Sequence, residues 1–535
     1  MRSHMQVGSS GTLPQTHSES SANRINKLVT ATTKSLKTGT LPMGLLLLGV
    51  MLALTGCQQT EAGKAATASD STASKNTGKI SVSTASEEAR KDFLDGRDLA
   101  EKLRITDSIE HFDKAIAKDP NFAIAELNRA NVSPTAKEFF EHLKKAVALA
   151  DKASDGERLL ILATDAGANA NPTKQKELLD QLVTAYPNDE RAHFNLGGYY
   201  FGQQDFKQAI EHYKKATELA PNYSPAYNIL GYAYRQNEDY ANAESAFKKY
   251  IELIPNDPNP YDSYAELLLK VGRFDDSITQ YQKALAVDPN FFNSHLGIAA
   301  DYLYQGKASQ AQAELQKITD KARSDGERRA ALFAQMVVAV DGGKFDQALA
   351  EVQKQYDLGQ KTSDVPAMVG DLQLKGNVLL ASGKYDEARA AYEAALKMNN
   401  ESNLSQQLKD NAALFHHYNL ARVAIGKKDL ATAKAETATF KTGAETAKNP
   451  NLIKQSHELA GMIALEEKSY DNAIAELNQS NQQNPNNLYL LGQAYQGKGD
   501  AAKAKDWFKK TANFNSLPAI NYAFVRAKAT KMLAG

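Results

Sequence analysis

The feature that most constrains the fold is a proline that returns at a constant interval. Pro187, Pro221, Pro255 and Pro289 are equally spaced along the chain. The chain has only 16 prolines in 535 residues, so three successive matches at one interval lie far outside chance. A fixed period of about 20 to 50 residues is typical of solenoids and other repeat arrays. The length of the chain therefore cannot be divided into ordinary globular domains.

Small and large residues keep the same period. One position well before each proline holds a small residue, and a second position about two helical turns before it holds a large one. A small residue lets two helices approach closely, and we expect the large one to fill the gap between neighbouring hairpins. The register continues beyond these prolines, because "SDGER" begins at 154 and again at 324, five periods later. The small residues are Ala163, Gly197, Gly231 and Ala265, and the large ones are Leu179, Tyr213, Phe247 and Tyr281.

These columns resemble the tetratricopeptide repeat, a helix–turn–helix unit of about 34 residues. The interval between the four prolines matches the length of that unit. Residues 192–221 and 226–255 carry nearly every signature position of that family. The resemblance predicts an all-α fold, an α-solenoid of about 11 or 12 hairpins that form a superhelix. Weaker copies are indicated by the small residues Gly96, Gly376, Gly461 and Gly492.

Three segments depart from the repeat. Residues 128–151 lack the glycine and proline columns and are expected to change the local curvature. Residues 397–411 are expected to lengthen a connection and to divide the solenoid near residue 400. A helix over 517–533 is predicted to cap the last repeat, because it has a proline near its start and an apolar stripe. The predicted organisation is a leader (1–56), a linker (57–85), an N-terminal solenoid (86–400) and a C-terminal solenoid with its capping helix (401–535).

The amino-terminal segment has the layout of a signal peptide. Residues 43–54 (MGLLLLGVMLAL) are apolar and follow a stretch with basic residues and almost no acidic ones. A bilayer-spanning helix needs about 20 apolar residues, so this run is too short to be a permanent span. The tetrapeptide Leu54-Thr55-Gly56-Cys57 resembles the bacterial lipobox, whose cysteine is lipidated and becomes the first residue after cleavage. Cys57 is the only cysteine, which excludes an intramolecular disulfide and a multi-thiolate metal site.

The lipobox resemblance implies a protein that stays attached to a membrane, since several acyl chains give stable anchoring. Gln58 stands where enteric-type bacteria place the aspartate that retains lipoproteins in the inner membrane. The resemblance therefore implies the periplasmic side of the outer membrane of a Gram-negative bacterium. Residues 57–85 are small and polar and are predicted to be a flexible linker. Two alternatives stay open: Cys57 is an inert thiol, or the leader is not processed and the protein stays in the cytoplasm.

Function is expected on the concave face, which the family lines with the first helix of each hairpin. Aromatic and arginine side chains there are typical of peptide-binding hot spots. A carboxylate clamp of the kind known in this family is not expected, because its positions hold Phe194, Asn228 and Asp262 and no lysine. The alternative for Phe194 and Phe201 is packing between helices. The predicted groove for a protein or peptide consists of Phe194, Phe201, Asn228, Tyr232, Arg235, Asp262 and Glu266.

Charge and motifs exclude several classes of function. Basic and acidic residues both number 63, so the chain lacks the basic footprint of nucleic-acid binding. No H-E-x-x-H, G-x-S-x-G or P-loop pattern occurs. His416 and His417 have no carboxylate or cysteine at ligand spacing and are interpreted as structural or solvent-facing. The sequence therefore predicts no catalytic residue, no metal site and no cofactor.

The sequence as a whole predicts a lipid-anchored periplasmic scaffold or adaptor, acting in envelope assembly or secretion. It is expected to bind a protein or peptide in its concave groove. One alternative is a structural envelope protein that self-associates. An enzyme is less favoured, because no segment of about 100 residues remains outside the leader, the linker and the repeats. The partner and the oligomeric state are left open.

Overall fold

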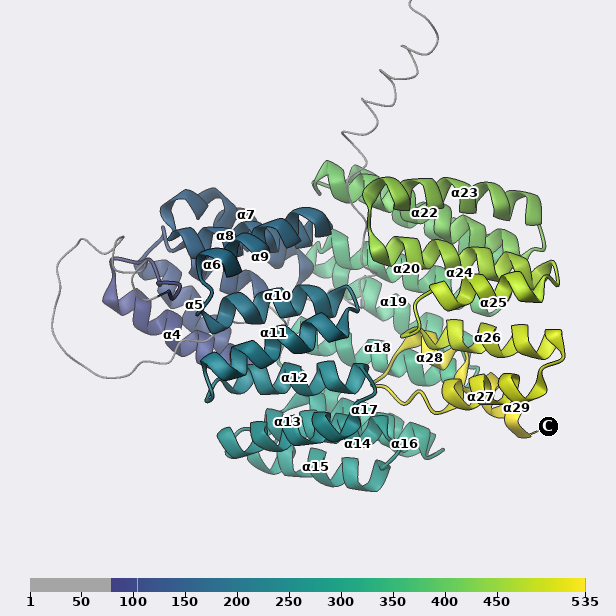
Figure 1. Cartoon of the computed structure of the whole chain (residues 1–535), viewed down its shortest axis with the longest axis horizontal. Coiled ribbons are helices and arrows are strands. Elements are labelled where there is room, and N and C mark those ends of the chain that lie inside the picture. The colour runs from purple at the N-terminus through teal and green to yellow at the C-terminus, as the bar shows by residue number, and fades with distance from the viewer. Residues whose placement is uncertain (1–77, 103, 535) are drawn as a thin grey trace, which may run out of the picture.

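The computed structural model describes residues 78–102 and 104–534. Within them the chain forms twelve successive helical hairpins followed by two short helices, and these residues contain no strand (Figure 1). The predicted all-α solenoid is therefore confirmed. The first six hairpins pair α4 (Glu87–Glu101) with α5 (Ile105–Lys118), α6 (Ala123–Asn131) with α7 (Ala136–Leu149), α8 (Asp155–Ala168) with α9 (Pro172–Ala185), α10 (Glu190–Gly202) with α11 (Phe206–Leu219), α12 (Ser224–Gln236) with α13 (Tyr240–Leu253) and α14 (Pro258–Lys270) with α15 (Phe274–Val287).

The second six hairpins continue the same stack. A short 3-10 helix, η2 (Ala150–Lys152), follows α7, and α28 (Ile520–Ala523) and α29 (Arg526–Ala534) end the chain. These hairpins pair α16 (Phe292–Tyr304) with α17 (Ala308–Lys321), α18 (Asp325–Asp341) with α19 (Phe345–Thr362), α20 (Val365–Ala381) with α21 (Tyr385–Glu401), α22 (Gln406–Gly426) with α23 (Leu430–Ala447), α24 (Pro450–Glu466) with α25 (Tyr470–Gln479) and α26 (Pro485–Lys498) with α27 (Ala501–Ala512).

The periodic prolines mark the ends of the second helices. Pro221 directly follows Ala220, the C-cap of α11, and Pro255 directly follows Ile254, the C-cap of α13. A proline cannot continue a helix, because it has no backbone N–H to donate. The next first helix begins a few residues later, so each proline separates two hairpins.

The glycine column allows the two helices of one hairpin to lie close together. A Cβ atom built on Gly231 would lie 2.6 Å from Cε1 of Phe247, and one on Gly197 would lie 2.8 Å from Cε1 of Tyr213. Phe247 and Tyr213 are fully buried. The large residue therefore fills the space against the glycine of its own hairpin. It also packs against the next hairpin, as expected from the sequence, because Phe247 shares a core cluster with Leu267 and Leu268 of α14.

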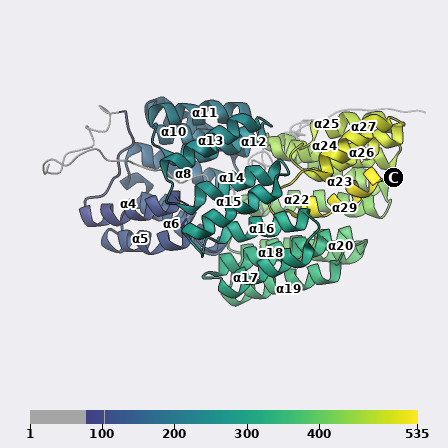
Figure 2. The same ribbon diagram turned by 90° about the horizontal axis from the view of Figure 1, so that it is seen from below.

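The solenoid curves with its first helices on the inside. First helices of successive hairpins pack on one another directly, as α14 does on α16 and α22 on α24, more closely than second helices do. The chain thereby winds so that α4–α16 and α20–α27 lie side by side, joined through α17–α19 (Figures 1 and 2). The inner surface made by the first helices is the concave face expected from the repeat.

The hairpins lengthen after residue 324. Helix α18 has 17 residues and α22 has 21, whereas α10 and α12 have 13 each. The extra residues around 397–411 extend α21 and α22 by further turns and leave only residues 402–405 between them. The expected long connection is therefore mostly helix, and the division near residue 400 stays a prediction.

Both expected terminal segments differ from their predictions within the described residues. The capping helix expected over 517–533 is two shorter helices, α28 and α29. The last part of the expected flexible linker is held in place: the backbone N–H of Ile80 donates to Asp189 at 2.8 Å, and that of Ser83 donates to Glu157 at 3.1 Å. Cys57, its lipobox, the leader and linker residues 57–77 lie outside the described residues.

Candidate peptide-binding surface

Three of the predicted groove residues form one cluster between consecutive first helices. The hydroxyl of Tyr232 on α12 donates to Oε1 of Glu266 on α14 at 2.9 Å. The Arg235 guanidinium lies 3.1 Å from Oε2 of the same carboxylate and 4.6 Å from the centroid of the Tyr232 ring. Charge-assisted bonds of this kind are stronger than neutral ones. The cluster therefore fixes α12 against α14 and leaves these side chains only partly exposed.

Two more predicted groove residues are buried behind this cluster. Asp262 on α14 accepts a hydrogen bond of 2.7 Å from the hydroxyl of Ser294 on α16. Burial, and then the neighbouring charge of Glu266, raise the pKa of Asp262 well above its usual range. Asn228 is only 5% exposed. Asp262 therefore joins α14 to α16, and neither buried side chain is free to contact a partner.

The two predicted phenylalanines occupy different environments. Phe194 is 2% exposed, and its ring centroid lies 5.6 Å from those of Tyr213 and Tyr223. It is a core residue, which corrects its assignment to the groove. Phe201, near the end of α10, is partly exposed and packs edge-on against Phe206 at 5.5 Å. Phe201 is thus only partly accessible on the inner helix, because it also packs against the buried cluster that contains Phe194 and Tyr213.

A second cluster of the same composition lies in the C-terminal half, outside the predicted groove. The hydroxyl of Tyr418 on α22 donates to Oε1 of Glu458 on α24 at 2.8 Å. The Arg422 guanidinium lies 5.4 Å from the Tyr418 ring centroid and donates to Asn377 on α20 at 2.9 Å. A tyrosine and an arginine on one first helix, followed by a glutamate on the next first helix, is a sequence pattern that could have indicated this cluster. The repeats of this half are longer, so Glu458 lies further along the chain from Tyr418 than Glu266 does from Tyr232.

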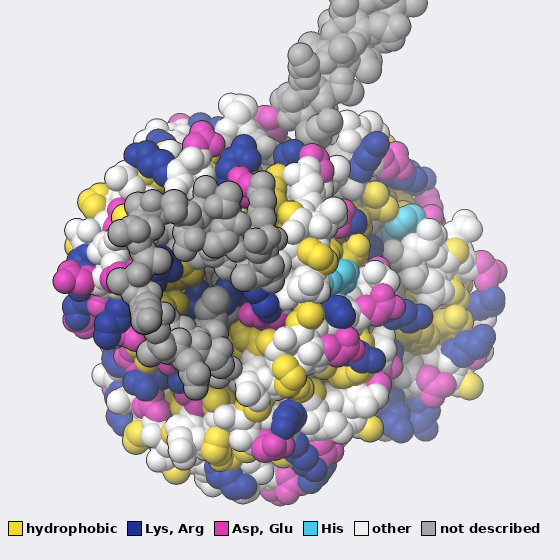
Figure 3. Space-filling view, turned by 60° about the vertical axis from the view of Figure 1, so that its left-hand side comes forward, with side chains coloured by type: hydrophobic (Ala, Val, Ile, Leu, Met, Phe, Trp, Pro, Cys, Tyr) yellow, Lys and Arg dark blue, Asp and Glu magenta, His cyan; other side chains and the backbone are white. Residues whose placement is uncertain are grey.

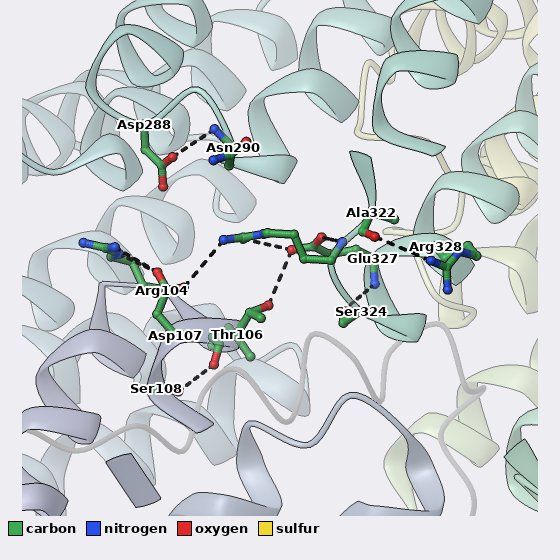
Figure 4. Close-up of polar contacts among 12 residues, drawn as sticks. Arg104, Thr106, Asp107, Ser108, Asp288, Asn290, Ala322, Ser324, Glu327 and Arg328 are labelled. Atoms are coloured by element: carbon green, nitrogen blue, oxygen red, sulfur yellow. Dashed lines mark hydrogen bonds and ion pairs between the residues drawn. The ribbon is translucent and has the colours of Figure 1, made fainter. Parts of the chain in front are cut away.

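The first hairpin contacts the central repeats. The Arg323 guanidinium, just before α18, lies 3.5 Å from Asp107 on α5 and 3.0 Å from Glu327 on α18. The hydroxyl of Thr106 donates to Glu327 at 3.4 Å, and Arg104 is paired with Asp107 at 2.8 Å (Figure 4). Contacts between residues far apart in the sequence therefore hold α5 beside the start of α18.

The C-terminal half contacts the carboxyl-terminal ends of the first helices, again at repeat spacing. Ser405 donates to Asn169 at 2.7 Å, and Lys454 donates to Gln204 at 3.0 Å. Lys510 lies 3.0 Å from Glu238. These contacts line up along the ends of α8, α10 and α12.

The described residues contain no group of three or more metal-ligating side chains, and none of their helices has the length and apolar character to cross a bilayer. A cavity of about 410 Å³ between α7 and α18 has three basic and three acidic side chains in its lining. His417 is paired with Glu436 at 2.6 Å, a contact within one hairpin. The face seen in Figure 3 mixes both signs of charge with apolar side chains.

Comparison with known protein families agrees with the geometry. Residues 190–223 and 485–512 match descriptions named "Tetratricopeptide repeat", and residues 227–413 match "Tetratricopeptide repeat-like domain". The chain therefore contains tetratricopeptide repeats. No curated protein matches the chain.

Solved structures of repeat proteins resemble parts of the chain. A MamA protein is 22% identical, with 31% of this chain and 91% of that chain covered and a TM-score of 0.27. YrrB, described as a TPR protein with an unusual peptide-binding site, is 20% identical, with 39% and 91% covered and a TM-score of 0.22. TTC0263 of Thermus thermophilus is 21% identical, with 40% and 99% covered and a TM-score of 0.27. These similarities are too low to assign a function.

Proposed function

We propose that this chain of tetratricopeptide repeats is a non-enzymatic scaffold that binds a protein or peptide partner on the inner surface of its superhelix. The observation that carries the proposal is the row of partly exposed aromatic side chains on consecutive inner helices, Phe201 on α10 and Tyr232 on α12. Tyr232 stands beside a charged pair, Arg235 and Glu266, at the same surface. Aromatic rings next to arginine are the side chains that dominate binding energy in protein interfaces.

The paired charges make this surface selective in what it accepts. Because Arg235 already has Glu266 as its partner, a ligand that offers only a carboxylate must compete with an existing ion pair. An extended or helical segment with apolar side chains gains more here, since it covers Phe201 and Tyr232 without breaking that pair. We therefore propose an apolar peptide segment as the partner, in place of a free acidic chain terminus.

We further propose that the scaffold is a lipoprotein attached through Cys57 and acts in assembly or secretion at the cell envelope. The support is the lipobox-like Leu54-Thr55-Gly56-Cys57 after an apolar run. Structure adds a fixed exit point for the linker, because Ile80 and Ser83 are hydrogen-bonded at the N-terminal ends of α10 and α8. Residues 57–77 would then connect the membrane to the solenoid. A flexible linker of this length has an end-to-end distance of about 25 Å.

Site-specific photo-crosslinking in cells tests the binding surface. A photoreactive phenylalanine replaces Phe201 on the inner helix α10, and in a matched variant it replaces Lys214, an exposed residue on the outer helix α11 of the same hairpin. We expect a discrete crosslinked product from position 201 and none from position 214. A product whose mass is twice that of the chain would identify self-association. Equal products from both positions, or none from either, would refute the inner surface as the binding site.

Metabolic labelling tests the anchor. Cells that express the chain receive a radioactive or alkyne-tagged fatty acid, and the same is done with the Cys57→Ala variant. We expect label in the parent protein and none in the variant. Absence of label from both proteins would refute the lipid anchor and leave the proposed binding surface untouched.

A further inference from the structure

The last segment of the chain crosses from the final hairpin to the inner side of the central repeats. This C-terminal segment, residues 513–526, follows α27 and includes α28. Helix α28 packs against both α18 and α26, and it lies between them in Figure 1. A helix that only capped the last repeat would contact α27 alone, as α29 mainly does.

Inner helices bind the backbone of this segment. The ammonium group of Lys270, at the end of α14, donates to the carbonyl of Phe514 at 2.6 Å and lies 3.9 Å from the centroid of the Phe514 ring. The hydroxyl of Tyr304, at the end of α16, donates to the carbonyl of Ser516. These two donors occupy equivalent positions in successive hairpins, so the repeat itself sets their spacing.

Side chains of the segment are recognised as well. The Tyr522 ring is 1% exposed and packs against Tyr304 with centroids 5.4 Å apart. Arg526 makes two bonds to the carboxylate of Asp341 at the end of α18, with Nε 2.7 Å from Oδ1. Such a forked contact is specific for arginine, since the planar guanidinium matches the two carboxylate oxygens.

Apolar contacts complete the site. Ile520, Ala523 and Phe524 pack into a cluster whose other members lie on α18, α19 and α20. A short helix that lays its apolar face between longer helices is a common mode of peptide recognition. The buried partners on α18 and α20 are Met336, Val337, Ala339, Val340 and Val378.

We propose that the inner ends of α14, α16 and α18 form a peptide-binding site, and that the C-terminal segment of the same chain is its resident occupant. The inference rests on the proposed function, because this site adjoins the binding surface: Lys270 follows Glu266 by one helical turn on α14. The ligand class is a segment with aromatic and apolar residues followed by an arginine. A partner that binds here must carry that pattern and displace the segment.

Displacement is a competition between an intramolecular and an intermolecular ligand. A segment tethered by a short chain has an effective concentration on the order of millimolar, so a free peptide at micromolar concentration cannot compete with it. Loosening the resident segment without touching the site should therefore make the site accessible. Arg526 is the natural position to change, because it belongs to the occupant and Asp341 belongs to the site.

The test uses the full mature chain and a fluorescent peptide of residues 513–534 with the parent sequence. Binding is measured by fluorescence anisotropy for the parent chain, for Arg526→Glu and for the milder Arg526→Gln. We expect at least tenfold tighter binding of the peptide by both variants than by the parent, and no binding of a peptide that itself carries Arg526→Glu. Lys531→Glu, an exposed charge reversal in the next turn of α29, is the matched control and should behave as the parent does.

Limited proteolysis of the same proteins reports whether the segment is released. Cleavage within 513–526 should rise in Arg526→Glu, because two like charges then face each other. It should fall again in the double variant that carries Asp341→Arg and Arg526→Asp, because the exchanged residues again have opposite charges. Unchanged cleavage in Arg526→Glu, or release without tighter peptide binding, would overturn the proposal. Crosslinking at position 201 does not depend on Arg526, so the proposed binding surface can fail or succeed independently.

Discussion

The tight approach of α10 and α11 predicts that Gly197→Ala destabilises their hairpin. The added Cβ would lie 2.8 Å from Cε1 and 2.9 Å from Cδ1 of Tyr213, closer than carbon atoms approach in proteins. Tyr213 cannot swing away, because it is fully buried and packs against Phe194. Overfilling a packed core costs about 1–3 kcal/mol in the free energy of unfolding.

A second glycine on the same helix supplies the control. No atom lies within 4 Å of a Cβ built on Gly202, so Gly202→Ala introduces no contact. Alanine gains up to about 1 kcal/mol of helix propensity at Gly197, inside α10, and less at Gly202, the last residue of that helix. The packing cost outweighs this gain, so Gly202→Ala should be more stable than Gly197→Ala by about 1–2 kcal/mol. Ala265 occupies the same column in α14, so a hairpin can be built around the extra carbon and a graded loss is expected.

Native-state hydrogen exchange is the suitable assay, because a repeat array does not unfold in one step. Amide protection is compared in α10 and α11 for the parent and the two variants, with α26 and α27 as a distant reference. We expect reduced protection in α10 and α11 of Gly197→Ala only. Equal protection in the two variants would refute the claim that Tyr213 limits the helix spacing.

Three further predictions concern buried polar groups. Burial raises the pKa of Asp301 to about 8, so the folded protein keeps a proton that the unfolded chain releases. This group should therefore lower stability by up to about 1.4 kcal/mol per pH unit as the pH rises from about 4 to 8. Hydrogen exchange in α16 should show a smaller pH dependence in Asp301→Asn, while Glu101, Asp257 and Asp371, whose pKa values burial also raises, keep their own contributions. Burial, and then the proximity of His193, lower the pKa of His212, so below about pH 6.5 the unfolded chain binds a proton that the folded chain does not. Stability should therefore fall as the pH is lowered through this range. Hydrogen exchange in α11 should show this fall in the parent and not in His212→Gln. Tyr418→Phe removes a hydrogen bond from Glu458 and should cost about 1–3 kcal/mol in the local stability measured by hydrogen exchange in α22 and α24. Unchanged exchange in those helices would contradict the buried cluster.

Much of the fold could be predicted because its signals are local and recur. In the central repeats a proline directly after the second helix and a glycine opposite an aromatic ring recur at the repeat interval, and both act in the structure as helix ends and close contacts. Repeat position also brought Tyr232, Arg235 and Glu266 together correctly. These residues interact across one repeat, a distance that periodic reasoning covers.

Other parts of the site could not be predicted from the pattern. A repeat column fixes the angle of a side chain around its helix but not its depth, so Phe194 was placed in the groove although Tyr213 and Tyr223 cover it. The contact between Arg526 and Asp341 spans 185 residues and depends on the curvature summed over many hairpins. No local sequence property of either residue predicts this contact.

The central claim is that the inner helices, and not the outer ones, contact the partner. Once crosslinking has identified that partner, hydrogen exchange of the mature chain with and without it tests the claim most directly. We expect new protection in α10, α12 and α14 with little change in α11, α13 and α15. Protection confined to those outer helices would contradict it.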